Sequence, residues 1–76
     1  MNRPALTPIQ IIEAARKSLA KATSAAGIEY AHDTAIGAVN TLEDLRMIGM
    51  DCWRSTCAEF DSLADSRRAL LEGGAK

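Results

Sequence analysis

The residues that could carry out chemistry are few in this sequence, and their spacing does not assemble them into a catalytic site. His32 is the only histidine and stands beside Asp33, so one chain cannot supply a metal site built from several histidines. A nucleophile pair of His32 with Cys52 or Cys57 is formally possible, but no spacing supports it, and a solvated or capping histidine is the simpler interpretation. The glycines are isolated and form no phosphate-binding loop. We therefore predict a protein that is not an enzyme, with no catalytic residues, no metal and no cofactor.

The two cysteines are predicted to be reduced, structural thiols. Cys52 and Cys57 are five residues apart, so on a helix they point about 140° away from each other, which is too divergent for a disulfide. The C-x₄-C spacing without a nearby histidine is not a zinc signature. The start of the chain lacks the apolar segment of a secretory signal, and no apolar run approaches the roughly 18 residues of a membrane span. We therefore expect a cytoplasmic protein with no membrane partner, in a compartment that keeps thiols reduced.

Three arginines, Arg16, Arg46 and Arg67, lie on or beside the apolar side of a predicted helix. The simpler interpretation is that each aliphatic stem covers apolar neighbours while the guanidinium reaches water. The alternative is a polar seam between the helices of an oligomer, in which these arginines and Tyr30 bind a phosphate or carboxylate. This alternative predicts an oligomeric protein that binds a small anionic or phosphorylated ligand.

A second group of residues predicts a protein partner. Ile36, Met47 and Met50 lie off the main apolar side of their helix, and Trp53, the only tryptophan, follows directly. Methionine and tryptophan are enriched at binding surfaces, because methionine adapts its shape and tryptophan contributes a large contact area. These four residues are the candidate partner-binding site; otherwise they pack against the first helix or line a homodimer interface.

Charge argues against nucleic acid as the general partner. The formal net charge is −1, whereas nucleic-acid binders gain much of their affinity by neutralising phosphates with Lys and Arg. A helix over 55–72 would present acidic side chains where a groove-reading helix presents basic or amide ones. The first helix is a better candidate surface, with Arg16, Lys17 and Lys21. It supports, as a further alternative, a nucleic-acid-associated accessory protein.

Charge and size together predict self-association. Residues 1–26 carry four basic residues against one acidic residue, whereas residues 27–65 carry eight acidic residues against two basic ones. A basic first segment beside an acidic middle favours antiparallel packing within the chain or between copies, although two solvated faces would give the same pattern. At 76 residues the core is small, and much of its apolar content is alanine, which buries little area. We therefore expect a homodimer or a higher homo-oligomer.

The first predicted helix spans about 7–26 and has a strong start signal. Thr7 fits the N-cap, Pro8 the first helical position and Gln10 the third residue of a T-x-x-Q capping box. Gly27 fits a left-handed C-terminal cap, and Ile28 the apolar residue that follows such a cap. The pattern therefore predicts that this helix ends at Gly27.

Two further helices are predicted at about 33–49 and 55–72. Asp33 or Thr34 would cap the earlier one, and Thr56 with Glu59 forms a second candidate capping box. The core side of the helix over 33–49 is predicted to consist of apolar residues at helical spacing: Ala35, Ala38, Val39, Leu42, Leu45 and Gly49. The ends of the chain, 1–6 and 73–76, are expected to be flexible.

The apolar pattern also continues in phase from 33 to 72, as it would in one uninterrupted helix about 60 Å long. The fold prediction is therefore all-α and a single domain over 1–76. It is either a three-helix bundle or a helical hairpin with one long second helix. The predicted function is protein–protein interaction: a small regulator or inhibitor of a larger partner, for example a phage-encoded inhibitor of a host system.

Overall fold

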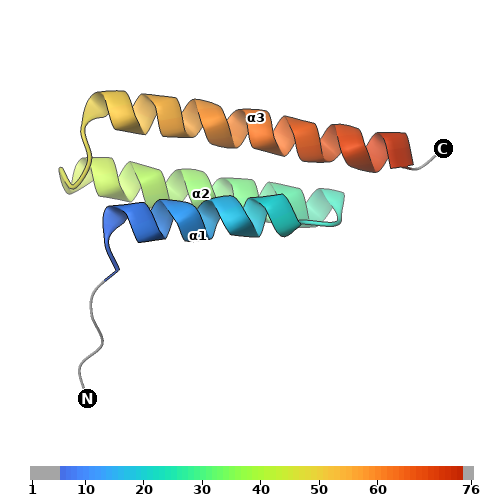
Figure 1. Ribbon diagram of the computed structural model, residues 1–76, viewed down its shortest axis with the longest axis horizontal. Helices are drawn as coiled ribbons and strands as arrows, with labels where there is room; N and C mark the ends of the chain where they lie inside the picture. The colour runs from blue at the N-terminus through green and yellow to red at the C-terminus, as the bar shows by residue number, and fades with distance from the viewer. Residues whose placement is uncertain (1–5, 75–76) are drawn as a thin grey trace, which may run out of the picture.

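A computed structural model describes residues 6–74, which fold into three antiparallel α-helices connected by short turns (Figure 1). The helices are α1 (Pro8–Lys21), α2 (Ala25–Asp44) and α3 (Met50–Gly74). The all-α three-helix bundle is therefore confirmed. The hairpin with one continuous helix over 33–72 is wrong, because the chain leaves the helix between Asp44 and Met50. Of the predicted flexible ends, residues 1–5 and 75–76 lie outside the described residues, and Gly73 and Gly74 belong to the last turn of α3.

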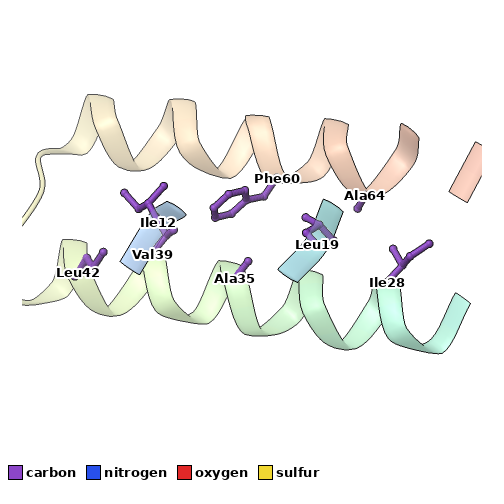
Figure 2. Close-up of a cluster of buried hydrophobic side chains, with 8 residues drawn as sticks. All are labelled: Ile12, Leu19, Ile28, Ala35, Val39, Leu42, Phe60 and Ala64. Atoms are coloured by element: carbon purple, nitrogen blue, oxygen red, sulfur yellow. The ribbon is translucent and has the colours of Figure 1, made fainter. Parts of the chain in front are cut away.

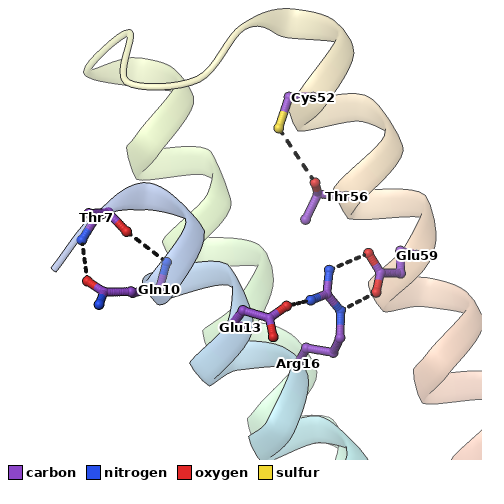
Figure 3. A network of polar contacts seen from close by, with 7 residues as sticks. All are labelled: Thr7, Gln10, Glu13, Arg16, Cys52, Thr56 and Glu59. Atoms are coloured by element: carbon purple, nitrogen blue, oxygen red, sulfur yellow. Dashed lines mark hydrogen bonds and ion pairs between the residues drawn. The ribbon is translucent and has the colours of Figure 1, made fainter.

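The start of α1 is as predicted. The Gln10 backbone N–H donates to Thr7 Oγ1 at 3.1 Å, and the Thr7 N–H donates to Gln10 Oε1 at 2.9 Å (Figure 3). Pro8 occupies the first helical position, where its missing N–H costs nothing. The backbone N–H groups of Thr7 and Gln10, which have no acceptor within the helix, are thus each satisfied by a side chain.

The connection between α1 and α2 corrects two predictions. The first helix ends at Lys21 and not near residue 26, and Gly27 is the third residue of α2 and not a C-terminal cap. The physical reason is Ser24, whose Oγ accepts the Gly27 N–H at 3.0 Å and caps α2, so that the helix begins at Ala25, eight residues before the predicted start. Asp33 and Thr34 therefore lie inside α2, in its third turn, and cap nothing.

The connection between α2 and α3 is a Schellman turn, which places the helix break earlier than predicted. The Met47 N–H donates to the Leu42 carbonyl at 2.8 Å and the Arg46 N–H donates to the Glu43 carbonyl at 2.9 Å. Arg46 has φ 58°, the left-handed conformation that usually selects glycine. Gly49 directly precedes α3, and its carbonyl accepts the Trp53 N–H at 3.0 Å.

The early start of α3 removes the second predicted capping box. Thr56 and Glu59 lie in the interior of α3, and Thr56 is buried. Leu45 is 65% exposed and Gly49 is exposed, so both leave the predicted core side of α2. The prediction was wrong there because the in-phase apolar pattern continued past the point at which the chain turns.

The core lies along the line where the three helices meet (Figure 2). It consists of eight buried apolar residues: Ile12, Leu19, Ile28, Ala35, Val39, Leu42, Phe60 and Ala64. Phe60 is the largest of them, is fully buried, and points from α3 towards the other two helices. Truncating such a side chain to alanine costs about 3–5 kcal/mol, a large part of the stability of a small domain. None of the helices within residues 6–74 has the length and apolar character needed to cross a bilayer.

Candidate functional site: an exposed apolar end of the bundle

The antiparallel topology brings the start of α1, the end of α2 and the start of α3 to one end of the bundle (Figure 1). Seven large apolar side chains are exposed in the described part of the chain, and five of them belong to this end. The other two are Tyr30 and Leu70. We call the five residues the apolar end: Leu6, Ile9, Leu45, Met47 and Met50. Exposed apolar residues are ordinary when scattered, whereas their concentration at one end marks a candidate interaction site.

The α2–α3 turn gives the apolar end a fixed shape. A surface hollow lies at this turn, between Met47 and Met50, which are 47% and 55% exposed. Its lining combines apolar and charged side chains: Glu43, Asp44, Arg46, Met47, Ile48, Gly49 and Met50. The two hydrogen bonds of the Schellman turn hold the backbone beneath these side chains. The methionines therefore present adaptable side chains on an ordered backbone.

The four predicted partner-binding residues divide into two pairs. Met47 and Met50 belong to the apolar end. Ile36 and Trp53 are half-buried and pack against the core, and Trp53 Nε1 donates to Asn40 Oδ1 at 2.7 Å, which joins α3 to α2. Trp53 thus has a contact within the chain that accounts for its position.

Sequence reasoning missed Leu6, Ile9 and Leu45 as members of this surface. Ile9 carried a signal, because it lies off the side of α1 that holds Ile12 and Leu19. Leu45 carried none, because its exposure depends on where α2 ends.

The predicted arginine seam does not form within one chain. Arg16 is held by two carboxylates: its Nη1 pairs with Glu13, and its Nε and Nη2 make a two-pronged contact with Glu59 on α3 (Figure 3). The Nη2–Oε1 distance is 2.9 Å. Hydrogen bonding to Glu59 raises the pKa of Arg16, and the same bond lowers the pKa of the Glu59 carboxyl. Arg16 therefore joins α1 to α3.

The other two arginines lie at opposite ends of the bundle. Arg46 is exposed in the α2–α3 turn, whereas Arg67 Nη2 donates to the Ala22 carbonyl at 2.7 Å, beside the α1–α2 turn. That bond caps the C-terminal end of α1, where a cation is favoured. Arg67 Nε is buried without a hydrogen-bond partner among the described residues. Tyr30 is 74% exposed on α2 and joins none of these arginines in a hydrogen bond within residues 6–74.

Within residues 6–74, no hydrogen bond joins His32 to either cysteine. His32 Nε2 lies 2.7 Å from Asp61 Oδ1, an interaction between α2 and α3 that the sequence did not predict. His32 precedes the predicted helix over 33–49, whereas the structure places it inside α2. Burial, with a smaller effect of the Asp61 charge, raises the pKa of the Cys57 thiol. Cys52 is exposed, and its Sγ lies 3.9 Å from Thr56 Oγ1 (Figure 3). Residues 6–74 contain no cluster of three or more His, Cys, Asp or Glu side chains that could hold a metal ion.

No family model matches this chain, and neither a curated protein nor a solved structure matches it.

Proposed function

We propose that this protein acts by binding another protein through the apolar end, as a non-enzymatic regulator or inhibitor of a larger partner in the cytoplasm. The observation that supports the proposal is the concentration of five of the seven large exposed apolar side chains at one end of the bundle. A partner of matching chemistry presents apolar side chains that cover Met47 and Met50 and fill the hollow beside them. Occupying a surface of that partner would be the means of regulation.

The apolar end can contribute useful binding free energy. Full burial of one large apolar side chain contributes about 1.5–3 kcal/mol. Only about half of each of Met47 and Met50 is exposed, so covering the exposed half would contribute about 1 kcal/mol for each residue. An ordered turn also loses little conformational freedom on binding, which preserves this gain.

The test is capture followed by direct titration. The tagged protein is used to isolate partners from a lysate of the source cells, and the captured protein is then purified and titrated against variants. Replacing both Met47 and Met50 with alanine should weaken binding about 30-fold, corresponding to about 2 kcal/mol. Leu70→Ala, at the other end of the bundle, is the matched control because Leu70 is exposed to a similar degree. Equal binding by both variants would contradict the proposal.

Two other outcomes would favour the remaining functions. Thermal stabilisation by phosphorylated metabolites that depends on Arg16, Arg46 or Arg67 would favour the ligand-binding function. Salt-sensitive retention on DNA that depends on Lys17 and Lys21 would favour the nucleic-acid accessory function.

A further inference from the structure

A second surface, independent of the apolar end, runs along the bundle between α1 and α2. It is a groove whose lining comes from α1, the α1–α2 turn and α2, and none of its residues belongs to α3. Six of the lining residues are alanines: Ala14, Ala15, Ala22, Ala31, Ala35 and Ala38. Tyr30, one of the most exposed large side chains in the described part of the chain, stands at its edge. The groove is therefore largely apolar, and it is open to another element.

Gly37 on α2 supports the close approach of another element. A glycine in the interior of a helix costs roughly 0.5–1 kcal/mol relative to alanine. Nothing within the chain requires it here, since an added Cβ at Gly37 would meet no atom within 4 Å. Gly37 is exposed and directly precedes Ala38 of the groove lining, so a missing side chain there leaves room for a neighbour.

The charges on the two helices indicate what that neighbour is. Lys17 and Lys21 of α1 make no ion pair within residues 6–74, and Lys21 lines the groove. In contrast, α2 carries four carboxylates and no Lys or Arg. The only ion pair of these carboxylates in the same residues is between Asp33 and the neighbouring His32, at 4.0 Å. No carboxylate lines the groove itself, but of the two helices that form it, α1 carries unpaired positive charge and α2 carries uncompensated negative charge. Each helix therefore has the charge that the other helix of a second copy would complement.

We propose that the α1–α2 groove binds the same groove of a second copy, forming a symmetric homodimer with a four-helix interface. A two-fold axis parallel to the helices places α1 of one copy over α2 of the other. Because α1 and α2 are antiparallel within the chain, the helices that meet across the interface are antiparallel as well (Figure 1). Such an interface is self-complementary, as two-fold symmetry requires.

The positions of the charged residues along the helix axes, measured from the α1–α2 turn, identify the ion pair. Lys17 lies four residues before the end of α1, about 6 Å from the α1–α2 turn, and Asp33 lies eight residues after the start of α2, about 12 Å from it. Side chains on a helix lean towards its N-terminus, so Lys17 leans away from the turn and Asp33 leans towards it. A two-fold axis parallel to the helices leaves each residue's position along the helix axis the same in both copies. Lys17 of one copy and Asp33 of the other therefore converge, and they do so twice per dimer.

The decisive experiment exchanges the two charges. Lys17→Glu alone and Asp33→Lys alone each place like charges at both pairs, and each should weaken dimerisation about tenfold or more in sedimentation equilibrium. Mixing the two single variants restores both opposite-charge pairs, as does combining both substitutions in one chain, so both samples should regain wild-type dimerisation. Failure of both samples to regain it, while the single variants dimerise weakly, would overturn the assignment of the ion pair.

A steric test addresses the groove itself. Ala14→Trp fills the groove at an exposed position and should abolish dimerisation, whereas Ala58→Trp, at an exposed alanine of α3, should not. Circular dichroism of both variants verifies that each is folded. A wild-type monomer at millimolar concentration, or a dimer that is lost in Met47→Ala and retained in Ala14→Trp, would overturn the proposal.

Discussion

Arg46 offers a direct test of how this fold ends its second helix. Its backbone has φ 58°, and its N–H and that of Met47 make the two hydrogen bonds of the Schellman turn. The left-handed conformation brings the Cβ of an L-residue close to the following carbonyl oxygen, at a cost of roughly 1–2 kcal/mol that glycine avoids. Arg46→Gly should therefore relieve strain in the native state.

The net gain is smaller than the strain, because glycine also increases the conformational entropy of the unfolded chain, at a cost of about 0.4–1 kcal/mol. The Arg46 side chain makes no ion pair in the described part of the chain, so its removal costs little. We expect Arg46→Gly to raise the free energy of unfolding by about 0.5–1 kcal/mol. For a domain of this size, that raises Tm by roughly 2–8 °C.

Urea unfolding followed by circular dichroism measures the change, with the midpoint rising and the slope m unchanged. Arg46→Ala is the matched control, because it removes the guanidinium but keeps the Cβ in the left-handed region, so it should not stabilise the protein. Equal stabilisation by glycine and alanine would refute the backbone argument and assign the effect to the charge. Destabilisation by glycine would show that the conformation is not strained.

Three further measurements test contacts elsewhere in the bundle. The hydrogen bond from Arg16 lowers the pKa of the Glu59 carboxyl, so this pair stabilises the native state at pH values above the pKa that Glu59 has in the unfolded chain, and the stabilisation is lost as the pH falls through the pKa in the folded protein. Glu59→Gln should therefore make the free energy of unfolding fall less steeply at acidic pH. The difference should be less than about 1 kcal/mol, because the pair is partly exposed. Because burial raises the pKa of the Cys57 thiol, mass spectrometry after brief alkylation at neutral pH should find modification mainly at exposed Cys52, and equal modification would contradict this. Thr7→Ala should lower the free energy of unfolding by about 1 kcal/mol, whereas Thr7→Ser should have little effect in the same urea titration.

Local signals in the sequence predicted those parts of the fold that depend on a few neighbouring residues. The capping box of Thr7 and Gln10 depends only on the four residues 7–10 and the helix that they begin, and its prediction was confirmed. The core positions of α2 also followed from helical spacing, at Ala35, Val39 and Leu42.

The two turns were harder to predict because each depends on a choice between competing signals. At the first, Gly27 as a C-terminal cap competed with Ser24 as an N-cap, and the hydroxyl bond prevails. At the second, the helix was predicted to end at Gly49, whereas the residue that adopts the left-handed conformation is Arg46. Tertiary packing can impose this on an arginine, since helices of these lengths must turn back where the core ends. The apolar end was predicted only in part, because its membership depends on that turn.

The two proposed surfaces share no residue, and together they predict bivalent binding. A two-fold axis parallel to the helices leaves both copies pointing in the same direction, so the two apolar ends would lie at the same end of the dimer. Two linked sites bind a surface that presents two partners far more tightly than one site does, often by 10²-fold or more. Lys17→Glu leaves Met47 and Met50 unchanged, so it should weaken capture on a dense partner surface while the affinity for dissolved partner stays the same. If both affinities were unchanged in a variant shown to be monomeric, the two surfaces would act independently, and the dimer would have another purpose.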